Sequence, residues 1–151
     1  GLMITASGPK VIEYNVRFGD PECQTLLRNL DTDLINIITS CVDDKLSEVT
    51  IINKKKTCVC VVIASNGYPK KFEKNFIIKN LKEAEQIDDV VIFHAGTKSL
   101  DNQLLSSGGR VLSITAVGSS IDDARKKAYQ AIEKLNWKHG FYRTDIGIKN
   151  F

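Results

Sequence analysis

Two runs near the start of the chain, residues 2–5 and 10–18, have the hydrophobic pattern and residue types that are typical of β-strands. The first is mostly apolar, and in the second apolar and polar residues alternate. The segment between them, Ala6-Ser7-Gly8-Pro9, contains a Gly-Pro pair, which is a strong turn signal. The pattern therefore predicts a β-hairpin.

The second of these runs has two chemically different faces. Side chains alternate across a strand. One face is apolar and consists of Ile12, Tyr14, Val16 and Phe18. The other face is polar and consists of Glu13, Asn15 and Arg17. The apolar face can enter a core, whereas the polar face groups a carboxylate, a carboxamide and a guanidinium.

A helical pattern begins after Gly19. Asp20 can cap a helix, Pro21 is tolerated at a first helical position, and Glu22 suits the positive end of the helix dipole. We expect a short helix through about Leu30 and a second one from about Asp31. The second helix has an i, i+3, i+4, i+7 stripe of Leu34, Ile37, Ile38, Cys41 and Val42.

The composition becomes rich in strand-forming residues from about Ser47. Residues 49–52 and 57–64 flank Lys54-Lys55-Lys56, and we predict a second hairpin with the lysines at its solvated tip rather than in a binding patch. Asn66-Gly67-Tyr68-Pro69 has the composition of a turn. The next expected elements are a short helix at 81–86, a strand at 90–93, a tight turn at Gly108-Gly109 and a strand at 110–117.

The clearest helix lies near the end of the chain. It opens at Ser120 with Asp123 three residues later, which is close to a capping box. Its apolar stripe is Ile121, Ala124, Ala128, Ala131, Ile132 and Leu135. Residues 142–148 are expected to be extended. A β-rich order with one long late helix predicts an α+β fold with antiparallel sheets.

Bulk composition narrows the classes of partner. The chain has 151 residues, 42% of them hydrophobic and 26% charged, which is the range of globular proteins. The net charge of +3 is small and the basic residues are scattered, so we expect no nucleic-acid partner. The apolar runs are strand-sized and the start has no signal-peptide layout, so we expect no membrane partner and a cytoplasmic location. The four cysteines have no metal spacing and are expected to be buried free thiols.

The polar face of residues 10–18 has a chemical interpretation. Glu and Asn oxygens are ligands that Mg²⁺ accepts beside substrate phosphates, and an arginine is a forked donor for phosphate oxygens. Any strand with one solvated face shows the same alternation, so the pattern alone leaves both interpretations open.

The longer string Val11-Ile12-Glu13-Tyr14-Asn15-Val16-Arg17-Phe18-Gly19-Asp20-Pro21-Glu22 resembles the signature strand and turn of the ATP-grasp fold in the glycinamide ribonucleotide synthetase family (phosphoribosylamine–glycine ligases). Further strings are similar to that family in the same order: Ser65-Asn66-Gly67-Tyr68-Pro69, Phe93-His94-Ala95-Gly96-Thr97, Gly108-Gly109-Arg110-Val111-Leu112 and Arg143-Thr144-Asp145-Ile146-Gly147. Together they cover the whole chain.

The resemblance implies a fold and a reaction. Residues 1–46 would be the end of an ATP-grasp domain, a hairpin plus two helices. Residues 47–151 would be a small C-terminal domain with an antiparallel sheet and one long helix. ATP would phosphorylate the carboxylate of glycine, and the amine of 5-phosphoribosylamine would attack the resulting glycyl phosphate, a step of purine biosynthesis. The cofactor would be Mg²⁺ or Mn²⁺, with ATP as a substrate.

The resemblance also implies roles for particular residues. Glu13 and Asn15 would bind the metal that bridges the ATP phosphates. Arg17 would contact phosphate or, as the alternative, pair with Asp20 or Glu22, and we interpret Asp20 as a helix cap. Three further candidates for the substrate are His94, Arg110 and Arg143. The alternative for His94 is a structural role. The alternative for Arg143 is an ion pair with Asp145. His139 is expected to be a solvated residue near a helix end.

The chain starts at Gly1 without an initiator methionine and has no segment resembling the rest of an ATP-grasp enzyme. We therefore expect a piece that is inactive alone and that self-associates through apolar surface. The alternative is a non-catalytic, stand-alone α+β binding module.

Overall fold

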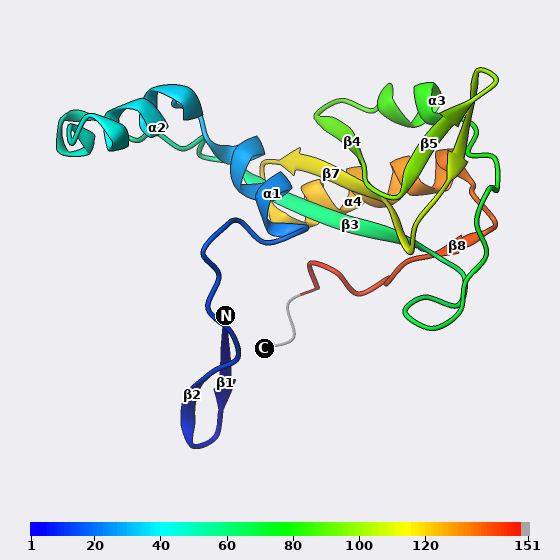
Figure 1. Ribbon diagram of the computed structural model, residues 1–151, viewed down its shortest axis with the longest axis horizontal. Coiled ribbons are helices and arrows are strands. Elements are labelled where there is room, and N and C mark those ends of the chain that lie inside the picture. Colours follow the sequence, from blue (N-terminus) through cyan, green and yellow to red (C-terminus); the bar gives the residue numbers. More distant parts are fainter. Residues whose placement is uncertain (149–151) are drawn as a thin grey trace.

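The computed structural model describes residues 1–148, which form three small antiparallel sheets and four α-helices (Figure 1). In chain order the elements are β1 (Leu2–Thr5), β2 (Gly8–Val11), α1 (Glu22–Asn29), α2 (Leu34–Val42), the 3₁₀ turn η1 (Leu46–Glu48), β3 (Thr57–Ser65), α3 (Leu81–Glu85), β4 (Val90–His94), β5 (Thr97–Leu100), β6 (Gln103–Ser106), β7 (Arg110–Gly118), α4 (Ile121–Leu135) and β8 (Gly140–Phe141). The predicted α+β class, an N-terminal hairpin and two helices followed by an antiparallel sheet with one long helix, is confirmed.

The central sheet has the strand order β4-β7-β3-β8, with every pair antiparallel. β3 and β7 pair regularly from Thr57 opposite Gly118 to Ile63 opposite Leu112. The register then shifts, because Ala64 lies opposite Arg110. Val111 is therefore an extra residue on β7, which makes this point a β-bulge.

The hydrophobic core lies between one face of this sheet and α4. Buried core residues come from both long strands and from the helix, namely Val59, Val61, Ile63, Leu112, Ile114, Ala116, Ala124, Ala128, Ala131, Ile132 and Leu135. The predicted stripe of α4 is confirmed, with Ile121 packing at its edge. At the start of α4, Ser120 Oγ accepts a hydrogen bond from the Asp123 amide at 3.1 Å, as the sequence predicted.

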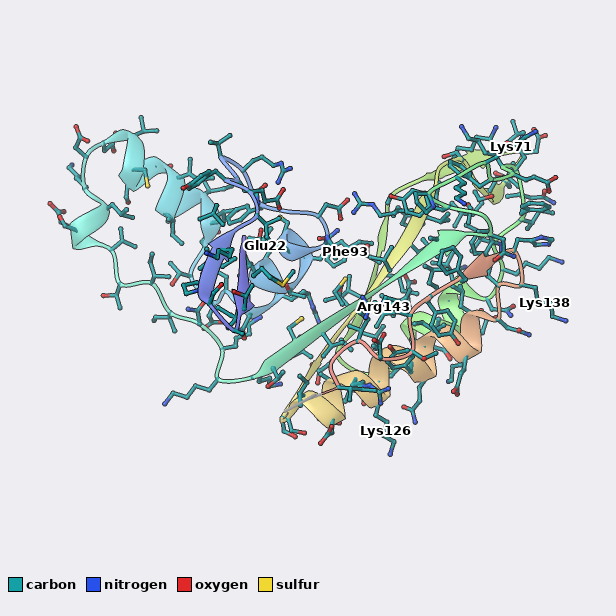
Figure 2. The ribbon with its side chains drawn as sticks, turned by 90° about the horizontal axis from the view of Figure 1, so that it is seen from below. Glu22, Lys71, Phe93, Lys126, Lys138 and Arg143 are labelled. Atoms are coloured by element: carbon teal, nitrogen blue, oxygen red, sulfur yellow. The ribbon has the colours of Figure 1, made fainter. Side chains whose placement is uncertain are left out.

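The other face of the sheet carries α1, which packs on β3 and β7. Figure 2 shows α1, marked by Glu22, and α4, marked by Lys126, on opposite sides of the sheet. A predicted boundary between Leu46 and Ser47 would assign α1 to the N-terminal domain, and that boundary stays a prediction. α1 nevertheless covers the C-terminal sheet.

The first hairpin is confirmed only in part. β1 and β2 pair from Leu2 opposite Val11 to Thr5 opposite Gly8, so Gly8 and Pro9 lie in the strand and the turn is at residues 6–7. The strand ends at Val11 instead of Phe18. Gly1 still pairs with Ile12 and Glu13, but within residues 1–148 no strand lies beside the residues that follow them, and regular strand structure does not continue. Figure 1 shows this hairpin and α2 projecting away from the sheet.

The predicted second hairpin is wrong. Residues 49–52 form no strand, and Asn53 instead makes an isolated bridge with Leu30. The Ile52 carbonyl accepts from the Asp31 amide at 2.9 Å, so this segment runs beside the α1–α2 connection. The lysine triplet is consequently a link into β3 rather than a hairpin tip. β3 finds its partner in β7, because only that pairing buries its apolar face against α4.

Two elements in the C-terminal part were not predicted. β5 and β6 form a hairpin whose turn residues Asp101 and Asn102 both have positive φ, 49° and 60°. Asp and Asn tolerate this conformation, which two-residue hairpin turns require.

The expected extended tail at 142–148 is wrong, since the strand at the end of the described chain is the short β8 and the residues after it turn back over the core.

None of the helices formed by residues 1–148 combines the length and apolar character needed to cross a bilayer.

Candidate functional site

Glu13, Asn15 and Arg17 form a hydrogen-bonded row, although they lie outside a regular strand. Asn15 Nδ2 donates to Glu13 Oε1 at 3.1 Å, and Arg17 Nη1 donates to Asn15 Oδ1 at 2.8 Å. Arg17 Nη1 also lies 3.2 Å from the carbonyl oxygen of Phe18, to which it donates. The three side chains therefore lie on one side of the chain, as the alternation predicted. We call them the polar row.

The turn after the polar row is held by its own side chains. Glu22 Oε2 accepts from the Gly19 amide at 2.7 Å, and Asp20 Oδ1 accepts from Gln24 Nε2 at 2.8 Å. The predicted capping role of Asp20 is wrong, because the residue at the cap position of α1 is Pro21, which makes no side-chain cap bond. The carboxylate of Asp20 instead accepts hydrogen bonds from Gln24 and from Arg110.

Arg110, the first residue of β7, holds this turn from the C-terminal sheet. Its Nη1 donates to the Asp20 carbonyl oxygen at 2.8 Å and its Nη2 to Asp20 Oδ2 at 3.0 Å. The two residues are 90 positions apart, so no local sequence signal joins them. Arg110 was predicted as a substrate contact, and its partnership with Asp20 was not foreseen.

The polar row, the turn and Arg110 line one open cleft of about 690 Å³. The side chains that carry charge in it are Glu13, Arg17, Asp20, Glu22 and Arg110, with Asn15 between them. Two guanidinium groups and three carboxylates at one surface can bind a ligand that is itself highly charged. The cleft therefore brings together four of the six predicted site residues.

The other two predicted site residues lie outside this cleft. His94 Nδ1 is 3.0 Å from Thr97 Oγ1, across the β4–β5 connection. Arg143 forms the ion pair with Asp145 that the sequence left open, with Nε 2.9 Å from Oδ1 and Nη2 2.6 Å from Oδ2. This hydrogen-bonded arginine lowers the pKa of the Asp145 carboxyl. Contacts of His94 and Arg143 with a substrate stay predictions.

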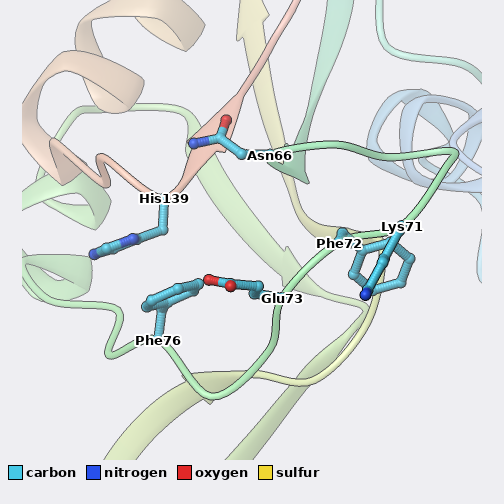
Figure 3. A pocket seen from close by; sticks show the side chains of 6 residues that line it. All are labelled: Asn66, Lys71, Phe72, Glu73, Phe76 and His139. Carbon is cyan, nitrogen blue, oxygen red and sulfur yellow. The ribbon is translucent and has the colours of Figure 1, made fainter.

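A second, smaller pocket of about 360 Å³ lies between the segment after β3 and the turn before β8 (Figure 3). Its lining residues are Asn66, Lys71, Phe72, Glu73, Phe76 and His139. His139 is exposed, as predicted, but its ring also lies on the Phe76 ring. Figure 3 shows these two rings on one side of the pocket and Phe72 on the other.

The glycines near Arg110 are needed for close approach. A Cβ atom on Gly96 would lie 2.6 Å from both Gly108 Cα and the Arg110 carbonyl oxygen. A Cβ atom on Gly108 would in turn lie 2.9 Å from Gly96 Cα, and one on Gly109 would meet the Tyr68 ring. These contacts fix the backbone at the start of β7.

The cysteines do not contribute reactive groups to the cleft. All four are free thiols, as predicted, but none is fully buried and Cys41 is exposed. Partial burial raises the pKa of the Cys58 and Cys60 thiols. In the described part of the chain, no three His, Cys, Asp or Glu side chains converge as a metal-binding group.

Metal binding at the polar row therefore depends on few protein ligands. Glu13 and Asn15 supply a carboxylate and a carboxamide oxygen, which matches Mg²⁺ sites that take most of their ligands from phosphates and water. Asn15 Oδ1 accepts a hydrogen bond from Arg17. The donor set fits a phosphate-bridged divalent cation, provided that Arg17 shares or releases this oxygen.

Comparisons with known proteins match both ends of the chain. Residues 58–149 match the family described as phosphoribosylglycinamide synthetase, C domain, and residues 1–23 match phosphoribosylglycinamide synthetase, ATP-grasp (A) domain. The second match contains the polar row, and the first contains Arg110.

Curated relatives are similar over nearly the whole chain. A phosphoribosylamine–glycine ligase of Brucella melitensis is 48% identical over 147 residues, which are 97% of this chain and 34% of that protein. A phosphoribosylamine–glycine ligase of Rhodopirellula baltica is 45% identical over 150 residues, 99% of this chain and 34% of that protein. The crystal structure of phosphoribosylamine–glycine ligase from Thermotoga maritima superposes with a TM-score of 0.72 at 31% identity, covering 96% of this chain and 35% of that one. The chain thus spans about a third of the length of these relatives.

Proposed function

Because the chain belongs to the phosphoribosylglycinamide synthetase family, we propose that it is the C-terminal part of a ligase that joins glycine to 5-phosphoribosylamine. The reaction would consume ATP and release ADP and phosphate, and it would serve purine biosynthesis. Nearly half of the residues are identical to those of phosphoribosylamine–glycine ligases across the whole chain, which supports this proposal.

The observation that carries the proposal is the shared cleft. The polar row lies in the segment that matches the ATP-grasp domain, whereas Arg110 lies in the segment that matches the C domain. Both line the same cleft, with Arg110 bound to Asp20. Charged groups from both parts of the chain therefore line one cleft, which is an arrangement that the binding of a polyphosphate requires.

In this proposal the polar row binds the phosphates of ATP. Glu13 and Asn15 would hold Mg²⁺ or Mn²⁺, which offsets the charge of the phosphate chain. Arg17, beside them, presents a forked donor to phosphate oxygens. A carboxylate that attacks a phosphate meets strong charge repulsion, which a divalent cation held by Glu13 and Asn15, together with the Arg17 guanidinium, would lower.

The cleft also has a task after phosphorylation. Glycyl phosphate would be labile in water, so its site must exclude solvent and hold the amine of 5-phosphoribosylamine in line with the acyl carbon. The cleft is open in this chain, and we propose that the remaining part of the ligase covers it. We also propose a cytoplasmic location and domains of residues 1–46 and 47–151.

The test is a ligase assay of the full-length protein with glycine, ATP and freshly prepared 5-phosphoribosylamine, following ADP release. Glu13→Gln keeps the shape of the side chain and removes its charge. We expect it to lower kcat/KM by on the order of 100-fold and to raise the Mn²⁺ concentration needed for half-maximal rate. Glu48→Gln, on the exposed η1 turn, is the matched control and should keep wild-type kinetics.

Absence of ADP release by the full-length protein would overturn the proposal and leave the stand-alone binding module as the better explanation. The 151-residue chain by itself should give no turnover. Ligase activity of that chain alone would contradict the inactive-piece proposal without affecting the reaction assigned to the whole protein.

A further inference from the structure

We infer that Arg110 is a positioning residue, which holds the Gly19–Glu22 turn and thereby sets the polar row in place. The inference rests on the proposed function, because it concerns the nucleotide end of the same cleft. In this inference the C-terminal sheet has two roles. It completes the cleft, and through Arg110 it fixes the geometry of the ATP-grasp segment.

The backbone that carries Arg110 is anchored on both sides. The Gly96 amide donates to the Arg110 carbonyl at 2.8 Å, and the Ser65 amide donates to the Gly109 carbonyl at 2.7 Å. Ser65 Oγ donates to the Gly108 carbonyl at 2.9 Å, and Ser65 is only 1% exposed. The start of β7 is therefore a rigid base for the arginine.

Both terminal nitrogens of the Arg110 guanidinium donate to a single residue, Asp20. One Nη atom binds the main-chain oxygen of Asp20 and the other binds its carboxylate. A main-chain contact fixes the path of the turn itself, whereas a purely side-chain ion pair would leave it free. The Glu22–Gly19 and Gln24–Asp20 bonds lie within the local segment, whereas the bonds from Arg110 join the turn to the sheet ahead of the packing of α1 on β3 and β7.

The turn and the polar row are directly continuous. Arg17 donates to the carbonyl of Phe18, which is two residues before Asp20, and its Nη1 also holds Asn15. A turn that shifts on losing Arg110 would displace Phe18 and with it the guanidinium of Arg17. Arg110 thus acts on the proposed metal and phosphate ligands through Asp20 rather than by touching them.

A direct role for Arg110 on substrate phosphate predicts different behaviour. If Arg110 bound substrate, removing Asp20 would free the guanidinium and leave it available to that ligand. If Arg110 positions the turn, Asp20→Ala has a smaller effect than Arg110→Ala, because it keeps the main-chain oxygen that Arg110 also binds, and removing both side chains adds little to the effect of Arg110→Ala. The two roles are therefore separated by a double-mutant cycle.

The experiment measures Mn²⁺ binding in the presence of ATP by electron paramagnetic resonance, in the intact protein carrying Arg110→Ala, Asp20→Ala or both. Arg110→Ala should weaken binding of the Mn²⁺–nucleotide complex by roughly 3- to 10-fold, Asp20→Ala should weaken it less because the main-chain acceptor remains, and the double variant should bind as weakly as Arg110→Ala alone. Arg110→Lys, which keeps the charge and loses the fork, should also weaken binding. Lys126→Ala removes a cation from the exposed side of α4, and this variant should bind the Mn²⁺–nucleotide complex as wild type does.

A second readout does not depend on nucleotide. Amide hydrogen exchange of residues 12–22 should become faster in Arg110→Ala and Arg110→Lys than in wild type, while exchange in β3 and α4 stays slow. Unchanged exchange in residues 12–22, or additive losses of Mn²⁺ binding in the double variant, would overturn the positioning role.

Failure of the proposed function gives a different result. Glu13→Gln is measured in parallel, and it should weaken Mn²⁺ binding more than any Arg110 variant. If Glu13→Gln has no effect, the assignment of the metal site is wrong. If Glu13→Gln weakens binding and Arg110→Ala does not, only the inference about Arg110 is wrong.

Discussion

The imidazole of His139 lies flat on the ring of Phe76, with ring centroids 3.8 Å apart and 6° between the ring planes. The pair joins two segments that are distant in sequence, the loop before α3 and the turn before β8. Asn66 Nδ2 adds a 3.3 Å hydrogen bond to the carbonyl of Lys138 beside it. The stacked pair and the Asn66 hydrogen bond therefore tie the segment between β3 and α3 to the turn before β8 at two points.

Removing either ring should destabilise the folded chain to a similar extent. We expect a coupling free energy of about 0.5–1.5 kcal/mol between Phe76→Ala and His139→Ala in urea unfolding, as found for aromatic pairs. A cycle of Phe76→Ala with Lys138→Ala, a neighbour outside the stack, should be additive. Equal additivity in both cycles would mean that the stack contributes no stability.

Gly96→Ala should destabilise the fold and disturb the start of β7. The new Cβ would meet the main-chain atoms of Gly108 and Arg110, which cannot rotate away as a side chain can. We expect a loss of about 1–3 kcal/mol in the free energy of unfolding, the usual cost of overpacking. Ser99→Ala on the exposed β5 hairpin is the control and should change stability little. A Gly96→Ala variant of wild-type stability would contradict the close packing.

The Asp89–Lys127 ion pair should give the stability a defined pH dependence. Lys127 Nζ lies 3.1 Å from Asp89 Oδ2 and also donates to the Val117 carbonyl. The hydrogen bond from Lys127 lowers the pKa of Asp89 below its ordinary value of 3.8 and raises the pKa of Lys127. Because the pKa of Asp89 is lower in the folded chain than in the unfolded chain, its charged form stabilises the fold at pH values above the ordinary pKa. This stabilisation is lost as the pH falls through the folded-state pKa.

Asp89→Asn should therefore be less stable than wild type at neutral pH, by about 0.2–1 kcal/mol because the pair is partly exposed. The difference should shrink as the pH falls through the folded-state pKa of Asp89, because protonation then neutralises this position in the wild type as well. Thermal unfolding at several pH values measures it. Asp88→Asn, at the exposed neighbour, should show no such convergence, and a pH-independent difference for Asp89→Asn would exclude the ion pair as its cause.

The apolar side of α2 should make the isolated chain self-associate. Ile35 is 71% exposed and Val42 is 78% exposed, on a helix with no buried residue. Exposed apolar area of this kind favours association in water. Light scattering should show concentration-dependent oligomers that are reduced by Ile35→Glu with Val42→Lys. Asn36→Glu, on a side of the same helix away from Ile35 and Val42, is the matched control. A monomer at all concentrations would contradict this prediction.

Sequence-based prediction succeeded where the signal was local. α4 has its cap and its stripe within one stretch, from Ser120 to Leu135, and was placed correctly. The polar row was recognised because its three residues lie two apart. The hairpin turn at Asp101 and Asn102 was missed although it carried a local signal, since these residue types favour positive φ.

Long-range relationships were not available from the sequence. Residues 49–52 are as strand-like as β7, and only burial against α4 decides that β3 pairs with β7. The Arg110–Asp20 contact depends on how α1 docks on the sheet, so the spacing of the two residues could not indicate it. The predicted helix cap at Asp20 failed for the same reason, because a distant arginine engages that carboxylate.

The β-bulge at Val111 explains how an arginine on a core strand reaches the cleft. Leu112 belongs to the core on the α4 side, and a regular strand would turn Arg110, two residues earlier, toward the same side. Val111 and Leu112 are instead both fully buried, so the alternation of sides is broken once at this point. Deleting the extra residue would make Arg110 the direct neighbour of Leu112 in a regular strand, and its side chain would stay on the side of α1. The extra residue thus allows two successive side chains, Val111 and Leu112, to be buried while the side chain before them still reaches the binding surface.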